Sequence, residues 1–269
     1  MADEEPPRRR GIRTVGGELQ ISNLSIMAGV DGEVTMGQPH AKLRTDMWPF
    51  WVEDAIEAAD IACQMADQIP ALVAQLDDAG ELKDQIEREI DGLTIRELRA
   101  TMRAITASAF AIDAFYATVK ARCGPHPDEE KWRDKGTSRK RCITETIRYH
   151  LKINPPNVEA VKSCVAQVFT LRDWAAHMVV EFRDAVYRPD VEADVDWHFD
   201  AFRSQNAVSA VHYTVMILDY LVSILDRGGE ELAKGCKPLA LERMDAIFRA
   251  YEQVGLPEFQ RAGKQVPST

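Results

Sequence analysis

The sequence contains no apolar run long enough to cross a bilayer. A spanning helix needs about 20 consecutive apolar residues, and charged residues, which make up 28% of this 269-residue chain, interrupt every hydrophobic stretch sooner than that. The opening segment, MADEEPPRRR, also lacks the apolar core of a secretory signal. We therefore predict a cytoplasmic protein with no membrane partner.

Cysteines are few and scattered. The chain has five, none of them in a CxxC pair: Cys63, Cys123, Cys142, Cys164 and Cys236. Disulfide scaffolds and structural zinc sites both depend on even sets of suitably spaced ligands. We expect reduced thiols and neither kind of framework.

Motifs for common cofactors are missing as well. There is no P-loop or dinucleotide-binding glycine pattern, no HExxH motif, no GxSxG elbow and no EF-hand loop. The nearest approach to a metal-binding pair is Asp196, two residues before His198, a spacing more typical of a helix start with a capping aspartate. We predict no metal and no cofactor, and keep a metal-dependent helical enzyme as a remote alternative.

Helical spacing of apolar residues dominates what is present. From residue 46 onward apolar positions recur every three to four residues, whereas the earlier part carries short β-like segments with a hairpin turn at 30–34. The predicted fold class is all-α, an antiparallel helical bundle with a β-like N-terminal extension. The predicted parts are a disordered tail (1–14), a hairpin-like extension (15–45), an N-terminal helical segment (46–93), a helical bundle (94–228), and a C-terminal helix and tail (229–269).

Local signals place the ends of several helices. Thr94, three residues before Glu97, resembles a capping box and predicts the start of a long helix that ends at Gly124. A polar loop should follow over 125–140, and a further helix should begin at the prolines 155–156.

Arg172 fits the helical pattern least well. The helix after residue 156 carries an apolar stripe of four valines, Val158, Val161, Val165 and Val168. The next position on that stripe is Arg172, followed five residues later by His177. Removing the partner of a buried cation costs about 3–5 kcal/mol, so Arg172 should lie at a cleft, at an interface or beside a carboxylate.

An all-α bundle with an RxxxxH motif near the end of a helix resembles the HEPN superfamily. The segment 108–116 is similar to that family's first core helix, in which small residues lead to an acidic position, here Asp113. A polar residue after the arginine is common in the family, and Asp173 occupies that position. The resemblance covers roughly residues 98–226. Val179 stands where toxin members paired with a nucleotidyltransferase antitoxin often carry tyrosine.

The resemblance implies a metal-independent endoribonuclease in many members, including toxins and phage-defence effectors, and a silent binding module in others. RNA supplies its own nucleophile, the 2′-OH; histidine can accept or donate the proton, and arginine can hold the phosphorane oxygens. Carried over to this chain, Arg172 would hold the phosphate and His177 would be the acid or base. Asp113 and Asp173 would orient one or the other.

The spacing of the motif also bears on oligomeric state. Residues five apart on an ideal helix point roughly 140° away from each other, so Arg172 and His177 do not share a face. They converge through the long arginine stem, a break in the helix or a second subunit. In the family two protomers line one cleft, and we therefore predict a homodimer, with a protein partner or antitoxin as a further expectation.

Positive charge is concentrated in one local stretch. The formal net charge is −10, so any RNA contact must use a local basic patch rather than the whole surface. Arg139, Lys140 and Arg141 open a predicted helix, and Trp132 lies close before them. We interpret these four as a candidate RNA-binding patch in which cations follow phosphates and the indole stacks on a base. The alternative is a solvated loop whose neighbouring acids balance the charge.

An alternative without catalysis remains for the motif itself. Arg172 can pair with Asp113 or Glu181 inside the bundle, and His177 can cap a helix end. The chain would then be a HEPN-like interaction or regulatory module that acts through its dimer and its N-terminal extension.

Overall fold

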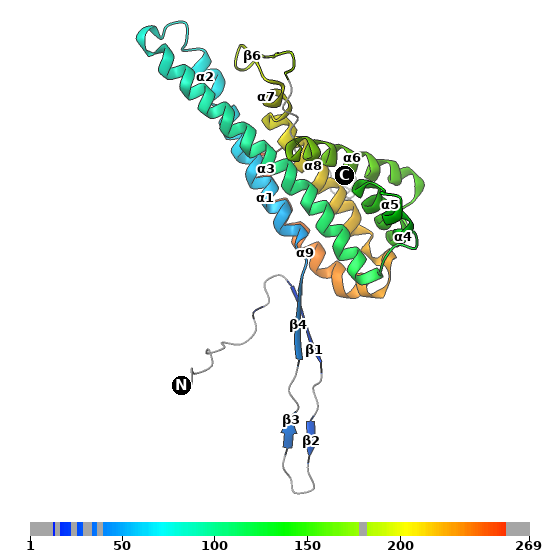
Figure 1. Ribbon diagram of the computed structural model, residues 1–269. Coiled ribbons are helices and arrows are strands. Elements are labelled where there is room, and N and C mark those ends of the chain that lie inside the picture. The colour runs from blue at the N-terminus through cyan, green and yellow to red at the C-terminus, as the bar shows by residue number, and fades with distance from the viewer. Residues whose placement is uncertain are drawn as a thin grey trace, which may run out of the picture. The chain divides into compact units, whose positions relative to one another are not determined.

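The computed structural model describes residues 13, 17–22, 26–28, 34–36, 40–177 and 182–256 (Figure 1). It divides into two compact units, 1–46 and 47–269. The structure is mostly helical, which agrees with the predicted all-α class at that coarse level. The predicted disordered tail lies outside the described residues, apart from Arg13. In the described ranges no helix is long and apolar enough to span a membrane.

The N-terminal unit consists of two short antiparallel strand pairs. Strand β1 (Gly17–Ser22) pairs with β4 (His40–Thr45), and β2 (Ile26–Ala28) pairs with β3 (Val34–Met36). Strands β2 and β3 pair on either side of the predicted hairpin turn, most of which lies outside the described residues.

The β1–β4 ribbon is amphipathic. Because side chains alternate along a strand, Leu19 and Ile21 share one face with Leu43, and these three side chains are 44–56% exposed. The opposite face carries Glu18 and Arg44, which form an ion pair at 2.5 Å. The ribbon by itself therefore has an apolar face opposite a charged one.

The helical unit is built around one long helix. Helix α3 (Lys83–Cys123) packs along α1 (Trp48–Ala66) and also contacts α5 (Arg139–Leu151), α6 (Pro155–Ala176) and α8 (Ser204–Ser223). Figure 1 shows α1 and α3 running side by side. Helix α9 (Lys237–Gln253) contacts α1 and α8. The remaining elements are short: α2 (Ile69–Val73), η1 (Gly80–Leu82), α4 (Glu129–Asp134), β5 (Val186–Arg188), β6 (Ala193–Val195), α7 (Trp197–Ala201), η2 (Leu225–Gly228) and η3 (Glu231–Cys236).

The predicted helix start at Thr94 is wrong. Helix α3 continues without a break through Gly92, and the Thr94 hydroxyl donates to the Ile90 carbonyl oxygen at 2.8 Å, a bond typical of a helix interior. Glu97 does not cap the helix either, because its carboxylate is fully buried and bonds to Arg188. The predicted segments 46–93 and 94–228 therefore share one helix. A glycine costs about 1 kcal/mol inside a helix, and the packing of α3 on α1 offsets it.

The sequence patterns missed three short elements, α4, β5 and β6. Helix α4 lies inside the predicted polar loop, and β5 pairs with β6 after the break that follows α6. Elements of three to six residues are too short to show a hydrophobic period.

A buried ion network fixes the β5–β6 hairpin to the helices. Arg188 is 1% exposed and donates to Glu97 Oε2 at 2.5 Å, to Asp190 Oδ2 at 2.7 Å and to the Phe199 carbonyl oxygen at 3.1 Å. The other Glu97 oxygen accepts the backbone N–H of Ser204, the first residue of α8, at 2.8 Å. Burial pushes the pKa of Asp190 upward, but the hydrogen bonds from Arg188 hold it below its ordinary value. The network joins β5, α7, α3 and α8 and sets the position of α7.

Candidate functional site

The RxxxxH motif lies at the C-terminal end of helix α6. Two prolines open the helix, and the four valines of the predicted stripe are buried. The helix ends at Ala176, so that His177 is its C-cap residue (φ −123°, ψ 56°). The His177 backbone N–H donates to the Asp173 carbonyl oxygen at 2.9 Å, and the His177 side chain is exposed.

Arg172 lies beside a carboxylate, one of the three settings expected from its place on the apolar stripe. Its side chain is 25% exposed, and its Nη2 is 2.7 Å from Asp173 Oδ1. The guanidinium carbon is 4.8 Å from the Phe169 ring centroid. The Nε atom is buried and has no hydrogen-bond partner in the described part of the chain. Arg172 is thus held by Asp173 and has a buried Nε–H without a partner among the described residues, and His177 is the exposed C-cap of the same helix.

Asp113 is engaged by the predicted RNA-binding patch rather than by Arg172. Arg139 donates to Asp113 Oδ1 from Nη2 at 2.5 Å and from Nε at 3.1 Å. The same guanidinium lies over the Tyr116 ring at 4.6 Å. Asp113, predicted to orient the motif, and Arg139, predicted to bind phosphate, therefore form an ion pair that joins α3 to α5.

The other three patch residues differ in their availability. Helix α5 begins at Arg139 as expected, and Lys140 and Arg141 are exposed. These two line an open depression of about 370 Å³ together with Ser138, Thr144, Glu145, Lys162 and Ala166. Trp132 is half-buried and stacks on His126, with ring centroids 4.3 Å apart and planes 23° apart. Lys140 and Arg141 remain open to a phosphate, whereas one face of Trp132 is already occupied.

A cluster that sequence analysis did not assemble lies beside the end of α6. The Trp174 ring meets the Trp197 ring edge to face, with centroids 6.2 Å apart. The Arg183 guanidinium lies 4.6 Å from the Trp197 ring centroid, and the His198 ring is 3.9 Å from that indole. Trp174 belongs to α6, and Trp197 and His198 open α7. The contact between them joins two elements that are 20 residues apart in the sequence, which spacing alone does not reveal.

Asp196 caps α7, which agrees with the capping interpretation of the Asp196–His198 pair. Its Oδ1 accepts the backbone N–H of His198 at 2.9 Å and lies 2.5 Å from the ring Nδ1 of the same residue. The backbone hydrogen bond from His198 holds the pKa of Asp196 below its ordinary value, so the carboxylate stays ionised. In the described ranges no group of three or more His, Cys, Asp or Glu residues is placed to hold a metal ion.

The cluster of Trp174, Trp197 and His198 contains two buried nitrogens without a hydrogen-bond partner in the described part of the chain. His198 Nε2 and Trp197 Nε1 are buried and have no hydrogen-bond partner among the described residues. Buried polar atoms without a partner are rare in folded proteins and call for an explanation such as a ligand or a catalytic role.

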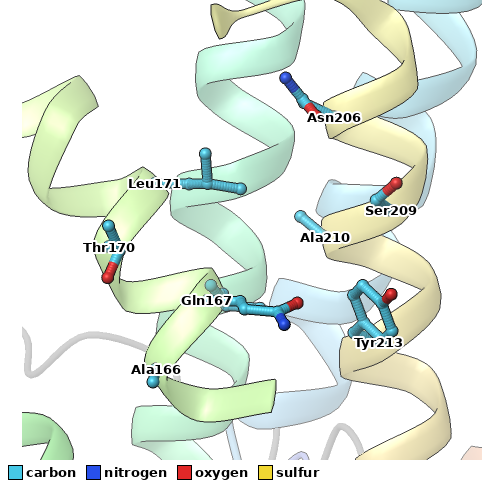
Figure 2. A pocket seen from close by; sticks show the side chains of 9 residues that line it. Ala166, Gln167, Thr170, Leu171, Asn206, Ser209, Ala210 and Tyr213 are labelled. Atoms are coloured by element: carbon cyan, nitrogen blue, oxygen red, sulfur yellow. The ribbon is translucent and has the colours of Figure 1, made fainter. Parts of the chain in front are cut away.

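A groove without charged residues runs between α6 and α8. It comprises two adjoining pockets of about 480 and 400 Å³ that share Gln167 and Tyr213. Figure 2 shows these two side chains extending toward each other from α6 and α8. Leu171, next to Arg172, lines the same groove. None of the residues that line either pocket carries a charge.

No family model matches this chain, and neither a curated protein nor a solved structure matches it.

Proposed function

We propose that the chain is a metal-independent endoribonuclease of the HEPN type that acts as a homodimer. The observation that carries the proposal is the end of α6. There an exposed histidine stands at the helix C-cap, and the arginine five positions earlier is held by Asp173 with one donor unused. An arginine and a histidine are sufficient for RNA cleavage by 2′-OH attack, because the substrate supplies the nucleophile.

The roles follow from the contacts of each side chain. Arg172 neutralises the phosphorane oxygens, for which its charge and its partly exposed side chain suit it. Asp173 positions Arg172 through the 2.7 Å ion pair. His177 is free at the surface to exchange a proton with the reacting oxygens. Asp113 acts indirectly, because its ion pair with Arg139 holds that arginine at the start of α5.

The open depression beside α5 supplies a path for the RNA backbone. Lys140, Arg141 and Lys162 line it, and only Glu145 among its lining residues is acidic. In an acidic chain, such a local group of cations is where phosphates bind first. Trp132, stacked on His126 through one ring face, can offer a base only its other face.

The groove between α6 and α8 supports the homodimer. Protein interfaces are depleted of charge at their centre and enriched in tyrosine and methionine. The groove has no charged lining, and Tyr213 and Met216 in it are each 43% exposed. A second copy packed on this face through a two-fold axis would bring both copies of the motif to one region, because Leu171 lines the groove next to Arg172.

RNA degradation by purified protein tests the proposal. In EDTA, the wild-type protein should cleave single-stranded RNA, and His177→Ala should lower the rate by about 10²–10⁴-fold, the range for losing a general acid or base. His40→Ala, an exposed histidine of the N-terminal unit, is the matched control and should leave the rate unchanged. A toxin or phage-defence role, with an antitoxin-like partner, would rest on the same activity.

The second candidate is a non-catalytic interaction module of the same fold. Two uncovered surfaces favour it: the charge-free groove of the helical unit and the apolar face of the β1–β4 ribbon with Leu19, Ile21 and Leu43. An isolated two-stranded ribbon is marginally stable in water, so a partner protein is its natural cover. A stable dimer that cleaves no RNA under any condition would favour this candidate.

A further inference from the structure

The pair Asp196–His198 has the geometry of a carboxylate–histidine dyad. We propose that His198 is the general base of the cleavage reaction, with Asp196 as its positioning residue, and that His177 is the general acid. This inference rests on the proposed ribonuclease activity and divides its two proton transfers between two histidines.

The hydrogen bonds assign the tautomer of His198. Asp196 is ionised and accepts only, so the ring Nδ1 at 2.5 Å carries the proton. In the role of a base, the ring carries its proton on Nδ1 alone, and Nε2 holds a lone pair. That nitrogen is buried and has no partner in the described part of the chain. A carboxylate on one ring nitrogen and an unused acceptor on the other is the arrangement by which a histidine is held ready to take a proton from a hydroxyl.

The dyad lies at the same end of α6 as His177. Trp174 precedes His177 by three residues, which places the two about one helical turn apart on neighbouring faces. The Trp174 ring contacts the Trp197 ring, and the Trp197 ring contacts the His198 ring. The arginine–glutamate network behind β5 keeps α7 in this position through Phe199.

Arg183 lies close to the Asp196–His198 dyad, because its guanidinium contacts Trp197. The Arg183 guanidinium lies over Trp197 at 4.6 Å. Its side chain is exposed, so an RNA phosphate can draw it from the indole. Since Nε2 is covered in this structure, the substrate must displace a covering group before the 2′-OH reaches it.

Two histidines account for both proton transfers in one step. Nε2 of His198 removes the proton of the 2′-OH, and the 2′-oxygen forms a bond to phosphorus. The bond from phosphorus to the 5′-oxygen breaks, and His177 in its protonated form gives its proton to that oxygen. The products are a 2′,3′-cyclic phosphate and a 5′-hydroxyl, with no oxidant, metal or co-reactant consumed. A single histidine cannot accept one proton and donate another simultaneously.

A substrate with an altered leaving group separates the two roles. The dinucleotide UpA and its analogue with sulfur in place of the 5′-bridging oxygen are cleaved by wild type, His177→Ala, His198→Ala and Asp196→Asn, with His40→Ala as control. A thiolate leaves without a proton, so His177→Ala should recover wild-type rates on the sulfur analogue. His198→Ala should stay about 10²-fold or more below wild type on both substrates, and added imidazole should restore part of its rate.

Asp196→Asn tests the positioning residue. Asparagine caps a helix as well as aspartate does, so the melting temperature should not change. The rate should fall at least about tenfold in kcat with KM unchanged, because the charge that stabilises the imidazolium is gone.

Each outcome decides between the claims. Wild-type cleavage that His177→Ala abolishes and His198→Ala leaves within twofold would refute the role of His198 and keep the ribonuclease. Recovery of His198→Ala on the sulfur analogue would reverse the two roles and overturn the assignment. No cleavage of either substrate by wild-type protein would remove the ribonuclease and the dyad's role together.

Discussion

The indole of Trp174, near the end of α6, meets the indole of Trp197, the first residue of α7, at a centroid distance of 6.2 Å and an interplanar angle of 89°. This contact places the RxxxxH motif next to the Asp196–His198 dyad. Edge-to-face pairs contribute about 0.5–1.5 kcal/mol beyond area burial. We predict a coupling free energy of that size in a Trp174→Ala/Trp197→Ala double-mutant cycle measured by urea denaturation. Additive effects would show that the two rings do not couple α6 to α7.

The buried ion network should be the most sensitive polar feature of the fold. Replacing Arg188 by methionine leaves the fully buried Glu97 carboxylate without its charge partner, which should lower the free energy of unfolding by about 3–5 kcal/mol. The control is Glu87→Gln, which removes an exposed pair with Lys83 and should change stability by no more than about 0.5 kcal/mol. Urea midpoints measure both. Adding Glu97→Leu to Arg188→Met should restore part of the loss, since no buried charge then remains unpaired.

His126 should make the fold less stable in weak acid. Burial lowers the pKa of His126, and its Nδ1 accepts the Asp128 backbone N–H at 3.0 Å, a bond that requires the neutral ring. The unfolded state therefore binds the proton more readily, so this stability is present above about pH 6.5 and is lost as the pH falls through the depressed value. Burial also lowers the pKa of His150 and His212, which add to the same trend.

Urea unfolding at pH 7.5 and pH 5.5 measures this effect. Wild-type protein should be less stable at pH 5.5, and His126→Phe, which keeps an aromatic ring against Trp132, should show a smaller difference. An equal difference in the two proteins would contradict the role of His126.

The groove between α6 and α8 should be the dimer interface. Met216→Glu places a charge in a groove that has none, and it should turn a dimer into a monomer. Leu241→Glu alters a comparably exposed residue, 41% against 43%, on α9 outside the groove and should leave the dimer intact. Light scattering coupled to size-exclusion chromatography reports the mass of each. A wild-type monomer at every concentration would remove the composite site.

Lys140 and Arg141 should govern the salt dependence of RNA binding. Each substitution by alanine removes one phosphate contact, so the slope of log K against log salt for single-stranded RNA should fall by about 0.7 per residue. Lys234→Ala, an exposed cation in η3 that pairs with Glu230, is the control and should leave the slope unchanged. Equal slopes for all variants would show that the depression beside α5 does not bind the RNA backbone.

Sequence patterns predicted the long helices with a clear hydrophobic period. They missed the short elements and the contacts between residues far apart in the sequence. The valine stripe predicted the buried face of α6, because hydrophobic periodicity is a local signal. The misfit of Arg172 predicted a cleft, an interface or a neighbouring carboxylate, and the structure shows the carboxylate of Asp173. The boundary at Thr94 failed because the same residue type that caps a helix also bonds back to the carbonyl four residues earlier when packing on α1 keeps the helix going.

The candidate site was only partly visible in the sequence. Asp113 was assigned to the RxxxxH motif, but in the structure it forms an ion pair with Arg139, a residue far from it in the sequence. The Asp196–His198 pair was recognisable as a cap, yet its contact with Trp174 depends on the β5–β6 hairpin and on Arg188, which no local pattern signals.

Chemical analysis of RNA ends tests the central claim most directly. A defined single-stranded RNA is incubated in EDTA with wild-type protein and with His177→Ala, and the 3′ ends of the fragments are identified by mass spectrometry. The account predicts 2′,3′-cyclic phosphate ends with wild-type protein and their loss with His177→Ala. Intact RNA with a stably folded wild-type dimer, or cleavage that persists in His177→Ala, would contradict it.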